Sequence, residues 1–307
     1  MRRRDLLAAL ASTPLWSLGC PAGTPPLRFS GIPDADKRAL KEGYQAVAAY
    51  LSAALKTPVE YVHVPDYTAA VTSLASGSID FAWLGGVTTV QAEARTPGGV
   101  HFIAARERDL HFKSYLVANR HAAEEAGLAP ISDRAPGTID ALRALAPAMK
   151  GKRFSFGAKN STSGHVMPRS FFGQAGIDPE ATFEGGPTYQ LKGGHAATLR
   201  AVAARVVDFG VLNFATWEDA DITLKKEAPV VAVTPEYVDY CLVAHARMPQ
   251  AQAEALRTAL TALDGADETQ AKVLSAFSAK RFVEVDPTAW DGIRSVLEAL
   301  NPEGTPP

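Results

Sequence analysis

The sequence contains only two cysteines among its 307 residues, Cys20 and Cys241. Cys20 lies in an N-terminal segment with the marks of an export signal, so the body of the chain is left with Cys241 alone. An internal disulfide and a zinc site built from paired cysteines are therefore both excluded. We interpret Cys241 as a buried small residue, unless the ligand is thiophilic, as arsenite is. With 47% hydrophobic residues, the chain has enough apolar material for two packed cores.

The sequence also lacks an excess of basic charge. It has 31 Lys and Arg residues against 33 Asp and Glu residues, which gives a net charge of −2. Loss of residues 1–19 removes three arginines and one aspartate and leaves a net charge of −4. Because surfaces that bind nucleic acid are basic, we expect no nucleic-acid partner.

Common catalytic signatures are missing as well. The sequence has no Gly-x-Ser-x-Gly elbow, no His-Glu-x-x-His pair and no Gly-Lys-Ser/Thr phosphate loop. We therefore expect no enzymatic activity, no catalytic residue, no metal site and no cofactor. An exported enzyme that uses a serine or a histidine of the polar loop described below stays open as a further hypothesis, because a fold alone does not exclude catalysis.

Long apolar runs are absent too. The run Leu6–Leu18 has 13 residues, whereas a bilayer-spanning helix needs about 20. Following three arginines, it indicates a secretory signal over residues 1–19. Arg3–Leu7 resembles a twin-arginine export motif. Ser17–Cys20 resembles a lipoprotein cleavage box, which would make Cys20 the lipidated N-terminus; the alternative is ordinary cleavage near Ala22. We expect an exported protein, periplasmic or membrane-anchored, that meets the membrane only through this lipid.

The first part of the body alternates strands and helices. Apolar segments at 27–32, 59–64, 79–84, 100–106 and 114–118 read as strands, with helical periodicity between the first four. Asp34 and Asp66 are placed to cap the first two helices. This alternation predicts an α/β sheet with crossover helices, in which ligands bind at the carboxyl ends of the strands. Three of these ends carry Pro33, Tyr67 and Gly86–Thr88, which we expect to lie side by side.

A polar loop dominates the second part of the chain. The strand Arg153–Phe156 runs into Asn160–His165, which contains three consecutive hydroxyl residues at the start of a helix. The first turn of a helix has free N–H groups and a partial positive charge, so anions bind there readily. Ser and Thr add O–H donors without adding charge. We predict that this loop holds a small oxyanion; the alternative is that its hydroxyls merely cap the helix.

The order of the elements predicts two α/β lobes, the second inserted in the first and joined to it by two hinge strands. Residues 20–120 and 234–307 form the first lobe in this interpretation, and residues 121–233 form the second. Two such lobes around a cleft make the architecture of a type II periplasmic binding protein.

Four segments resemble the phosphate/phosphite/phosphonate-binding proteins of ABC transporters: Ser161–Pro168, Gly194-His195, Phe81–Ala92 and Thr234–Tyr240. The Trp-Leu-Gly-Gly and Asp-Tyr parts look closest to a branch labelled as selenate or related oxyanion transport, and to arsenite-sensing relatives. The resemblance extends over nearly the whole mature chain, and the Ser-Thr-Ser-Gly-His loop is its most specific part.

The resemblance implies a set of ligand-binding residues, to which the strand end at residue 213 is added: Tyr67, Thr88, Ser161, Thr162, Ser163, His195 and Asn213. Each of the isolated residues also has a structural interpretation. Tyr67 can be a packing residue, His195 a helix cap and Asn213 a turn residue at a strand end. Ala196 follows the histidine where many relatives have Asp, which favours a small inorganic or short alkyl oxyanion. Glu184, Glu218 and Asp239 remain acids that could reach the cleft.

The predicted function is that of an exported, monomeric substrate-binding component that captures an oxyanion and delivers it to an ABC permease. The alternative is a sensory binding protein that passes its ligand-bound state to a membrane histidine kinase. The sequence leaves the identity of the oxyanion open.

Overall fold

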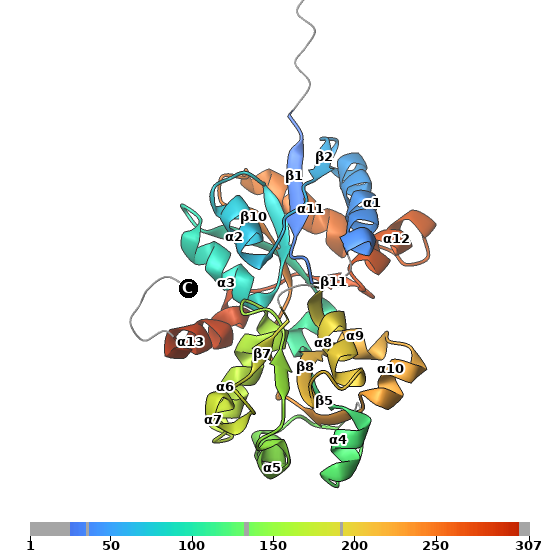
Figure 1. Cartoon of the computed structure of the whole chain (residues 1–307). Helices are drawn as coiled ribbons and strands as arrows, with labels where there is room; N and C mark the ends of the chain where they lie inside the picture. The colour runs from blue at the N-terminus through green and yellow to red at the C-terminus, as the bar shows by residue number, and fades with distance from the viewer. Residues whose placement is uncertain (1–24, 35–36, 132–134, 191–192, 301–307) are drawn as a thin grey trace, which may run out of the picture.

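The computed structural model describes residues 25–34, 37–131, 135–190 and 193–300. It consists of two α/β lobes, one above the other in Figure 1, each built around its own mixed sheet. The first sheet has six strands in the order β11-β4-β10-β3-β1-β2, and the second has five in the order β7-β6-β8-β5-β9.

The first lobe combines strands from both ends of the chain. Its strands are β1 (Leu27–Gly31), β2 (Val59–Tyr61), β3 (Phe81–Leu84), β4 (Val100–Arg106), β10 (Cys241–His245) and β11 (Phe282–Val283). Its helices are α1 (Lys37–Leu55), α2 (Tyr67–Ala75), α3 (Gly86–Arg95), α11 (Gln250–Thr261), α12 (Glu268–Ala276) and α13 (Asp291–Leu300), with the 3₁₀ turn η3 (Pro287–Trp290) before the last. β1 pairs in parallel with both β2 and β3, so their carboxyl ends lie side by side, as predicted.

The second lobe uses the middle of the chain. Its strands are β5 (Ser114–Ala118), β6 (Phe154–Phe156), β7 (Thr188–Tyr189), β8 (Phe209–Asn213) and β9 (Val230–Val233). Its helices are α4 (Arg120–Glu125), α5 (Ile139–Met149), α6 (Met167–Gln174), α7 (Pro179–Thr182), α8 (Gly194–Ala203), α9 (Phe214–Glu218) and α10 (Ile222–Glu227), with the π-helical turn η2 (Thr162–Val166) before α6. Among the described residues, no helix is long and apolar enough to span a bilayer.

The first crossing between the lobes lies earlier than the sequence boundary at residue 120 had placed it. β5 pairs with β8 and β9 of the second sheet, so the chain crosses at the 3₁₀ turn η1 (Glu107–His111). All five residues of β5 are buried, and a strand that is apolar on both faces carries no sign of the sheet it will join. The chain returns between β9 and β10. Phe112 and Tyr237 exchange backbone hydrogen bonds of 2.8 and 2.9 Å, so the two crossings are paired with each other.

A buried ion pair supports the first crossing. Arg106 donates from Nε and Nη2 to the two carboxylate oxygens of Asp109, at 2.7 and 2.6 Å, and from Nη1 to the carbonyl oxygen of Phe277 at 2.7 Å. The guanidinium carbon also lies 4.6 Å from the ring centroid of Tyr240. Bidentate pairing of this kind fixes geometry, and removal of either charge leaves the other buried without a counterion.

We expect Asp109→Ala to lower the free energy of unfolding by about 3–5 kcal/mol, because it leaves the Arg106 guanidinium buried and unpaired. Urea denaturation followed by circular dichroism measures the change. The matched control, Glu268→Ala, removes an exposed partner of Lys272 and should leave the urea midpoint unchanged. Equal midpoints for the two variants would contradict the structural role given to the buried pair.

Candidate functional site

The polar loop is folded tightly onto itself at the start of η2. Ser161 Oγ accepts from the Gly164 N–H at 3.0 Å, and the N–H groups of His165 and Val166 both donate to the Ser161 carbonyl oxygen. A Cβ atom on Gly164 would lie 2.8 Å from Ser161 Oγ, so the glycine is required for this close approach. Ser161 therefore does cap the helix, as the structural alternative expected. An accepting hydroxyl still has its own O–H to donate, so the cap leaves the loop able to bind an anion.

The start of α3 in the first lobe faces this loop directly. The Gly86 N–H donates to Asp239 Oδ1 at 2.8 Å, and the Val87 N–H donates across the cleft to Thr162 Oγ1 at 3.0 Å. Two helix starts, one from each lobe, therefore meet at this point. Thr88 is buried next to them, but its hydroxyl donates to the Gly85 carbonyl oxygen within the same helix. The hydroxyl of Thr88 is therefore already occupied, and a ligand would accept a hydrogen bond from its backbone N–H.

Tyr67 contributes a hydroxyl from the first lobe. Asp66 caps α2 by accepting from the Ala69 N–H at 2.8 Å, which fixes Tyr67 as the first residue of the helix. The buried Tyr67 hydroxyl is hydrogen-bonded to Ser161 of the other lobe. Burial raises the pKa of Tyr67 well above its ordinary value, and the nearby Asp34 carboxylate raises it further. The phenol therefore remains a neutral donor, beyond the packing role that was its alternative.

His195 lies in the first turn of α8 and points at the loop. Its Nε2 lies 3.4 Å from Ser163 Oγ, and its Nδ1 accepts from the backbone N–H of Asn213 at 3.3 Å. The N-cap of α8 is Gly193, in the left-handed region at φ 81°, so the alternative interpretation of His195 as a helix cap was wrong. Burial lowers the pKa of His195 to about 4, which keeps the imidazole neutral. Because Nδ1 accepts from the Asn213 N–H, the imidazole proton is assigned to Nε2. Nε2 therefore donates toward the loop and does not act as a base for Ser163.

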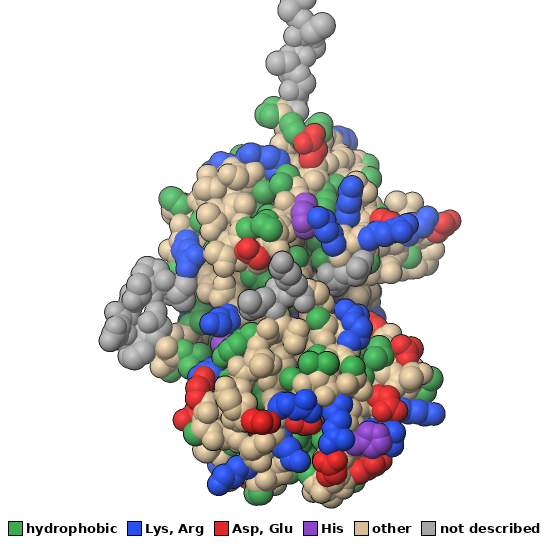
Figure 2. All heavy atoms as spheres, viewed as in Figure 1, with side chains coloured by type: hydrophobic (Ala, Val, Ile, Leu, Met, Phe, Trp, Pro, Cys, Tyr) green, Lys and Arg blue, Asp and Glu red, His purple; other side chains and the backbone are tan. Residues whose placement is uncertain are grey.

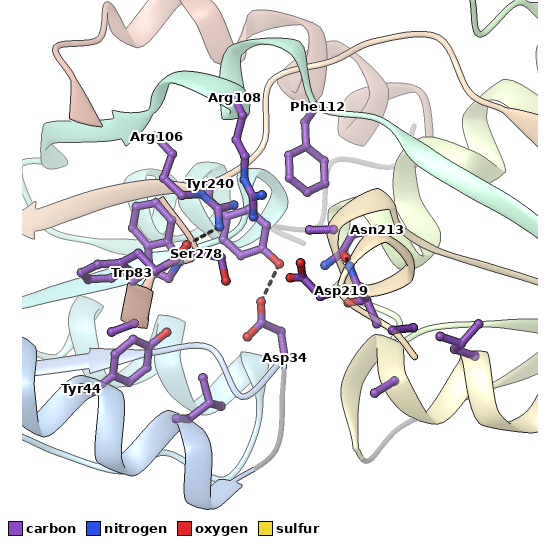
Figure 3. Close-up of a pocket in the computed structure, with 18 of the residues that line it drawn as sticks. Asp34, Tyr44, Trp83, Arg106, Arg108, Phe112, Asn213, Asp219, Tyr240 and Ser278 are labelled. Carbon is purple, nitrogen blue, oxygen red and sulfur yellow. Dashed lines mark hydrogen bonds between the residues drawn. The ribbon is translucent and has the colours of Figure 1, made fainter. Parts of the chain in front are cut away.

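Asn213 has the structural role that its alternative interpretation gave it. Its Oδ1 accepts from the Thr216 N–H at 2.7 Å and caps α9. Its backbone orients His195, and its side chain borders the cavity shown in Figure 3.

Asp239, one of the three acids that the sequence analysis kept as candidates to reach the cleft, lies at the site. It is 1% exposed, and its Oδ2 atom has no hydrogen-bond partner within the part of the chain that the structure describes. Burial raises the pKa of Asp239 to about 7, against the opposing effects of the Gly86 N–H and the Thr162 hydroxyl. Residue 241 of β10 is paired with Leu84 of β3, which brings the preceding Asp239 to the start of α3. Glu218, another acid considered, instead accepts from the Tyr115 hydroxyl.

A chain of hydroxyl contacts links the loop to the hinge. Ser114 Oγ donates to the Ser163 carbonyl oxygen at 2.7 Å and lies 2.5 Å from the Tyr237 hydroxyl. Tyr237 is the residue that pairs the two crossings. The position of the loop is therefore tied to the geometry of the hinge itself.

The cleft between the lobes contains two connected cavities. One, of about 490 Å³, is bordered by Tyr67. The other, of about 360 Å³, is bordered by Asn213 and Tyr240. Both touch Leu40, Ala196 and Arg200, so they form one cleft.

The groups gathered around the loop are hydroxyls, backbone N–H groups and a neutral imidazole, which suit an oxyanion. The described residues include no cluster of His, Cys, Asp and Glu that could hold a metal ion. Cys241 is fully buried, as expected, and burial raises the pKa of its thiol. Figure 2 shows acidic and basic side chains interspersed over the second lobe. The chemistry of the site is that of recognition by neutral donors.

Comparison with known proteins agrees with this chemistry. The family described as "ABC transporter, phosphonate, periplasmic substrate-binding protein" matches residues 29–290. The probable ABC transporter phosphite binding protein PhnD1 of Prochlorococcus marinus (strain MIT 9301) is 32% identical over 304 residues, which cover 97% of this chain and 95% of that protein. The structure of PhnD1 in complex with methylphosphonate has a TM-score of 0.79 and 32% identity, over 90% of this chain and 98% of that one.

A binding protein component of an ABC phosphonate transporter from Pseudomonas aeruginosa is also similar in structure. Its TM-score is 0.70 at 23% identity, over 89% of this chain and 86% of that one. At this identity the likeness shows the fold alone.

The raised pKa of Asp239 predicts a pH-dependent stability difference between the wild type and Asp239→Asn. Between pH 4 and 7 the folded wild type keeps a proton on Asp239 that the unfolded chain has lost, so this residue's contribution to stability falls as the pH rises. The free energy of unfolding of the variant, relative to wild type, should therefore rise by up to about 1.4 kcal/mol per pH unit.

Urea denaturation of the ligand-free proteins at several pH values measures this difference. His195, whose depressed pKa acts with the opposite sign between about pH 4 and 6.5, is present in both proteins and cancels. Glu298→Gln, in α13 at the surface, is the control and should show no such trend. A pH-independent difference for Asp239→Asn would overturn the protonation assigned to this carboxyl.

Proposed function

The chain belongs to the family of periplasmic phosphonate-binding proteins of ABC transporters, and from that premise we propose that it captures methylphosphonate, phosphite or a closely related phosphorus oxyanion between its lobes. The predicted family, the type II periplasmic binding fold and the role of a transporter's substrate-binding component are confirmed. The similar proteins bear the names of transporter components, so the sensory alternative gains no support. The same names favour phosphorus oxyanions over selenate or arsenite.

The observation that carries the proposal is the meeting of the α3 start with the Ser161–Ser163 loop. An anion placed there would receive hydrogen bonds from hydroxyls and N–H groups of both lobes, with Tyr67 and His195 at its sides. Hydrogen bonds to a charged group contribute about 1.5–3 kcal/mol each, so neutral donors alone can replace the hydration of a small ion. Because the donors come from both lobes, they can all be engaged only when the lobes are closed.

Asp239 adds a requirement for a proton. Its unpartnered Oδ2 lies at the start of α3, where an ionised carboxylate would repel a fully ionised ligand. A singly ionised phosphonate or phosphite has a P–OH group that can donate to this oxygen; equivalently, a protonated Asp239 can donate to the ligand. In both descriptions one proton is shared between them. This arrangement favours oxyanions that keep a proton near neutral pH over those that do not.

Lobe closure in this proposal takes place about the two paired crossings, residues 107–113 and 234–240. In this proposal the crossing at residues 107–113 takes the place of the lobe boundary that the sequence put at residue 120. The closed surface would then be what the permease recognises, and the protein would act as a monomer.

For the chain start, which lies outside the described residues, we propose that cleavage before Cys20 gives a lipid-anchored protein in the periplasm. The Ser17–Cys20 box and the absence of a spanning helix in the described part support this arrangement. Cys20→Ala removes the thiol that would be lipidated, so this variant should move from the membrane fraction to the soluble periplasmic fraction. Immunoblots of the two fractions make the test, and equal membrane retention of both proteins would rule the lipid anchor out.

The double variant Ser161→Ala/Ser163→Ala should bind methylphosphonate and phosphite at least about 100-fold more weakly than wild type. It loses two hydrogen bonds to a charged ligand of about 1.5–3 kcal/mol each, and every 1.4 kcal/mol is a factor of ten. Isothermal titration calorimetry measures the affinities, with circular dichroism to verify folding. Ser275→Ala, an exposed serine of α12, is the matched control. Unchanged affinity in the double variant would remove the loop from the binding site.

A further inference from the structure

Figure 3 shows the cavity of about 360 Å³, which Asn213 borders on one side. The first lobe provides an aromatic wall that includes Trp83, Tyr240 and Phe277, and the second lobe closes the other side with residues of α8, α9 and α10. Asn213 joins the two regions, because its N–H holds His195 while its side chain borders the cavity. Ala196, the residue after His195, also borders the cavity, so the cavity begins one residue away from the imidazole that contacts the loop.

Arg108 and the exposed Arg200 both border this cavity and form no ion pair within the described residues, but of the two only Arg108 has a buried N–H without an acceptor. Arg106 is fully engaged by Asp109 and the Phe277 carbonyl oxygen. Arg108, two residues on, forms no hydrogen bond or ion pair within the described ranges, and its Nε atom is buried. Its guanidinium carbon lies 5.3 Å from the ring centroid of Phe214. In Figure 3 it points into the cavity between Arg106 and Phe112. A buried N–H without an acceptor lowers the stability of the protein, so an anionic partner for this guanidinium would be favourable.

The acids that border the same cavity do not meet this need. Asp34, which the sequence predicts to cap the helix that follows it, accepts from the Tyr240 hydroxyl at 2.5 Å. Burial raises the pKa of Asp34, which weakens its repulsion of a second carboxylate. Asp219 is exposed to water and forms no ion pair with Arg108 in the described part of the chain. Burial, and then the neighbouring Arg106, lower the pKa of Arg108, which is the expected mark of an uncompensated cation.

We propose that this cavity takes the carbon-bearing tail of a larger phosphonate and that Arg108 binds a carboxylate on that tail, which makes phosphonocarboxylates a substrate class of the protein. The inference rests on the proposed function, because the phosphorus group must occupy the loop. The planar guanidinium can pair with both oxygens of a carboxylate, and the aromatic wall suits the methylene groups between the two anionic ends. An ammonium tail would be repelled by Arg108, and the acids that border the cavity are Asp34, which already accepts from Tyr240, and the exposed Asp219.

Isothermal titration calorimetry on the mature protein tests the tail site with phosphonates that differ only in their substituent. The panel is methylphosphonate as reference, then phosphonoacetate, 3-phosphonopropionate, 4-phosphonobutyrate and 2-aminoethylphosphonate. We expect at least one phosphonocarboxylate to bind about tenfold or more tightly than methylphosphonate, as one charge-assisted pair allows. In Arg108→Gln this gain should disappear, while the affinity for methylphosphonate stays within about threefold of wild type.

Two further variants complete the design. Arg108→Lys keeps the charge but loses the planar fork and should keep part of the gain; it also serves if Arg108→Gln folds poorly. Arg95→Gln, an exposed arginine at the end of α3, is the matched control and should leave every affinity unchanged.

Four outcomes would overturn the inference. No phosphonocarboxylate binds more tightly than methylphosphonate, the gain in affinity persists in Arg108→Gln, or 2-aminoethylphosphonate binds most tightly. The fourth is an equal loss of affinity for all ligands in Arg108→Gln, which would assign Arg108 to lobe closure through Phe214. If methylphosphonate binds and no phosphonocarboxylate gains, the tail site fails and the proposed function stands. If a phosphonocarboxylate binds through Arg108 and methylphosphonate does not bind, the tail site stands and the proposed ligands are wrong.

Discussion

The arrangement of the lobes depends on the acceptors found for the first N–H groups of α3. A helix start presents N–H groups with no partner in the helix, and here they are buried. Gly86 uses the Asp239 carboxylate of its own lobe, and Val87 uses the Thr162 hydroxyl of the other lobe. Approach of the second lobe therefore satisfies a donor of the first. The Val87 N–H belongs to a helix start that would attract an oxyanion and also contacts the other lobe, so ligand capture and closure involve the same helix start.

The site works with little charge. His195 is neutral, Tyr67 stays protonated and the loop contributes hydroxyls, so the ionisable group with most influence on a ligand is Asp239. An acid beside an anion site selects by protonation. Farther along the cleft the opposite situation holds, because Arg108 is a cation that forms no ion pair with the described residues and whose buried Nε has no acceptor among them. A carboxyl near the phosphorus group and a guanidinium near the tail together describe a ligand that is protonated at one end and anionic at the other.

Local sequence patterns predicted many of the strands and the polar loop. The features that depend on pairing between distant segments could not be predicted in this way. Hydrophobic runs bounded by turn residues placed β4 and β5 to the residue, and three adjacent hydroxyls at a helix start marked the loop. The sheet that β5 joins could not be predicted, because a mainly apolar strand that is buried on both faces can pair with either sheet. Asp239 reaches α3 only through the antiparallel pairing of β10 with β3, segments more than 150 residues apart. The hydrogen bond from the Tyr240 hydroxyl to Asp34 also joins residues far apart in the sequence, so no local pattern predicts it.

The most direct test of the account is the number of protons exchanged when methylphosphonate binds. Isothermal titration calorimetry at about pH 8.5, repeated in buffers with different ionisation enthalpies, gives this number. There both Asp239 and the second acidic group of the ligand are ionised in solution, and the complex is predicted to hold one shared proton between them. Binding should then take up close to one proton per ligand, and the uptake should fall in Asp239→Asn. Binding without proton uptake, or with the same uptake in the variant, would contradict the account.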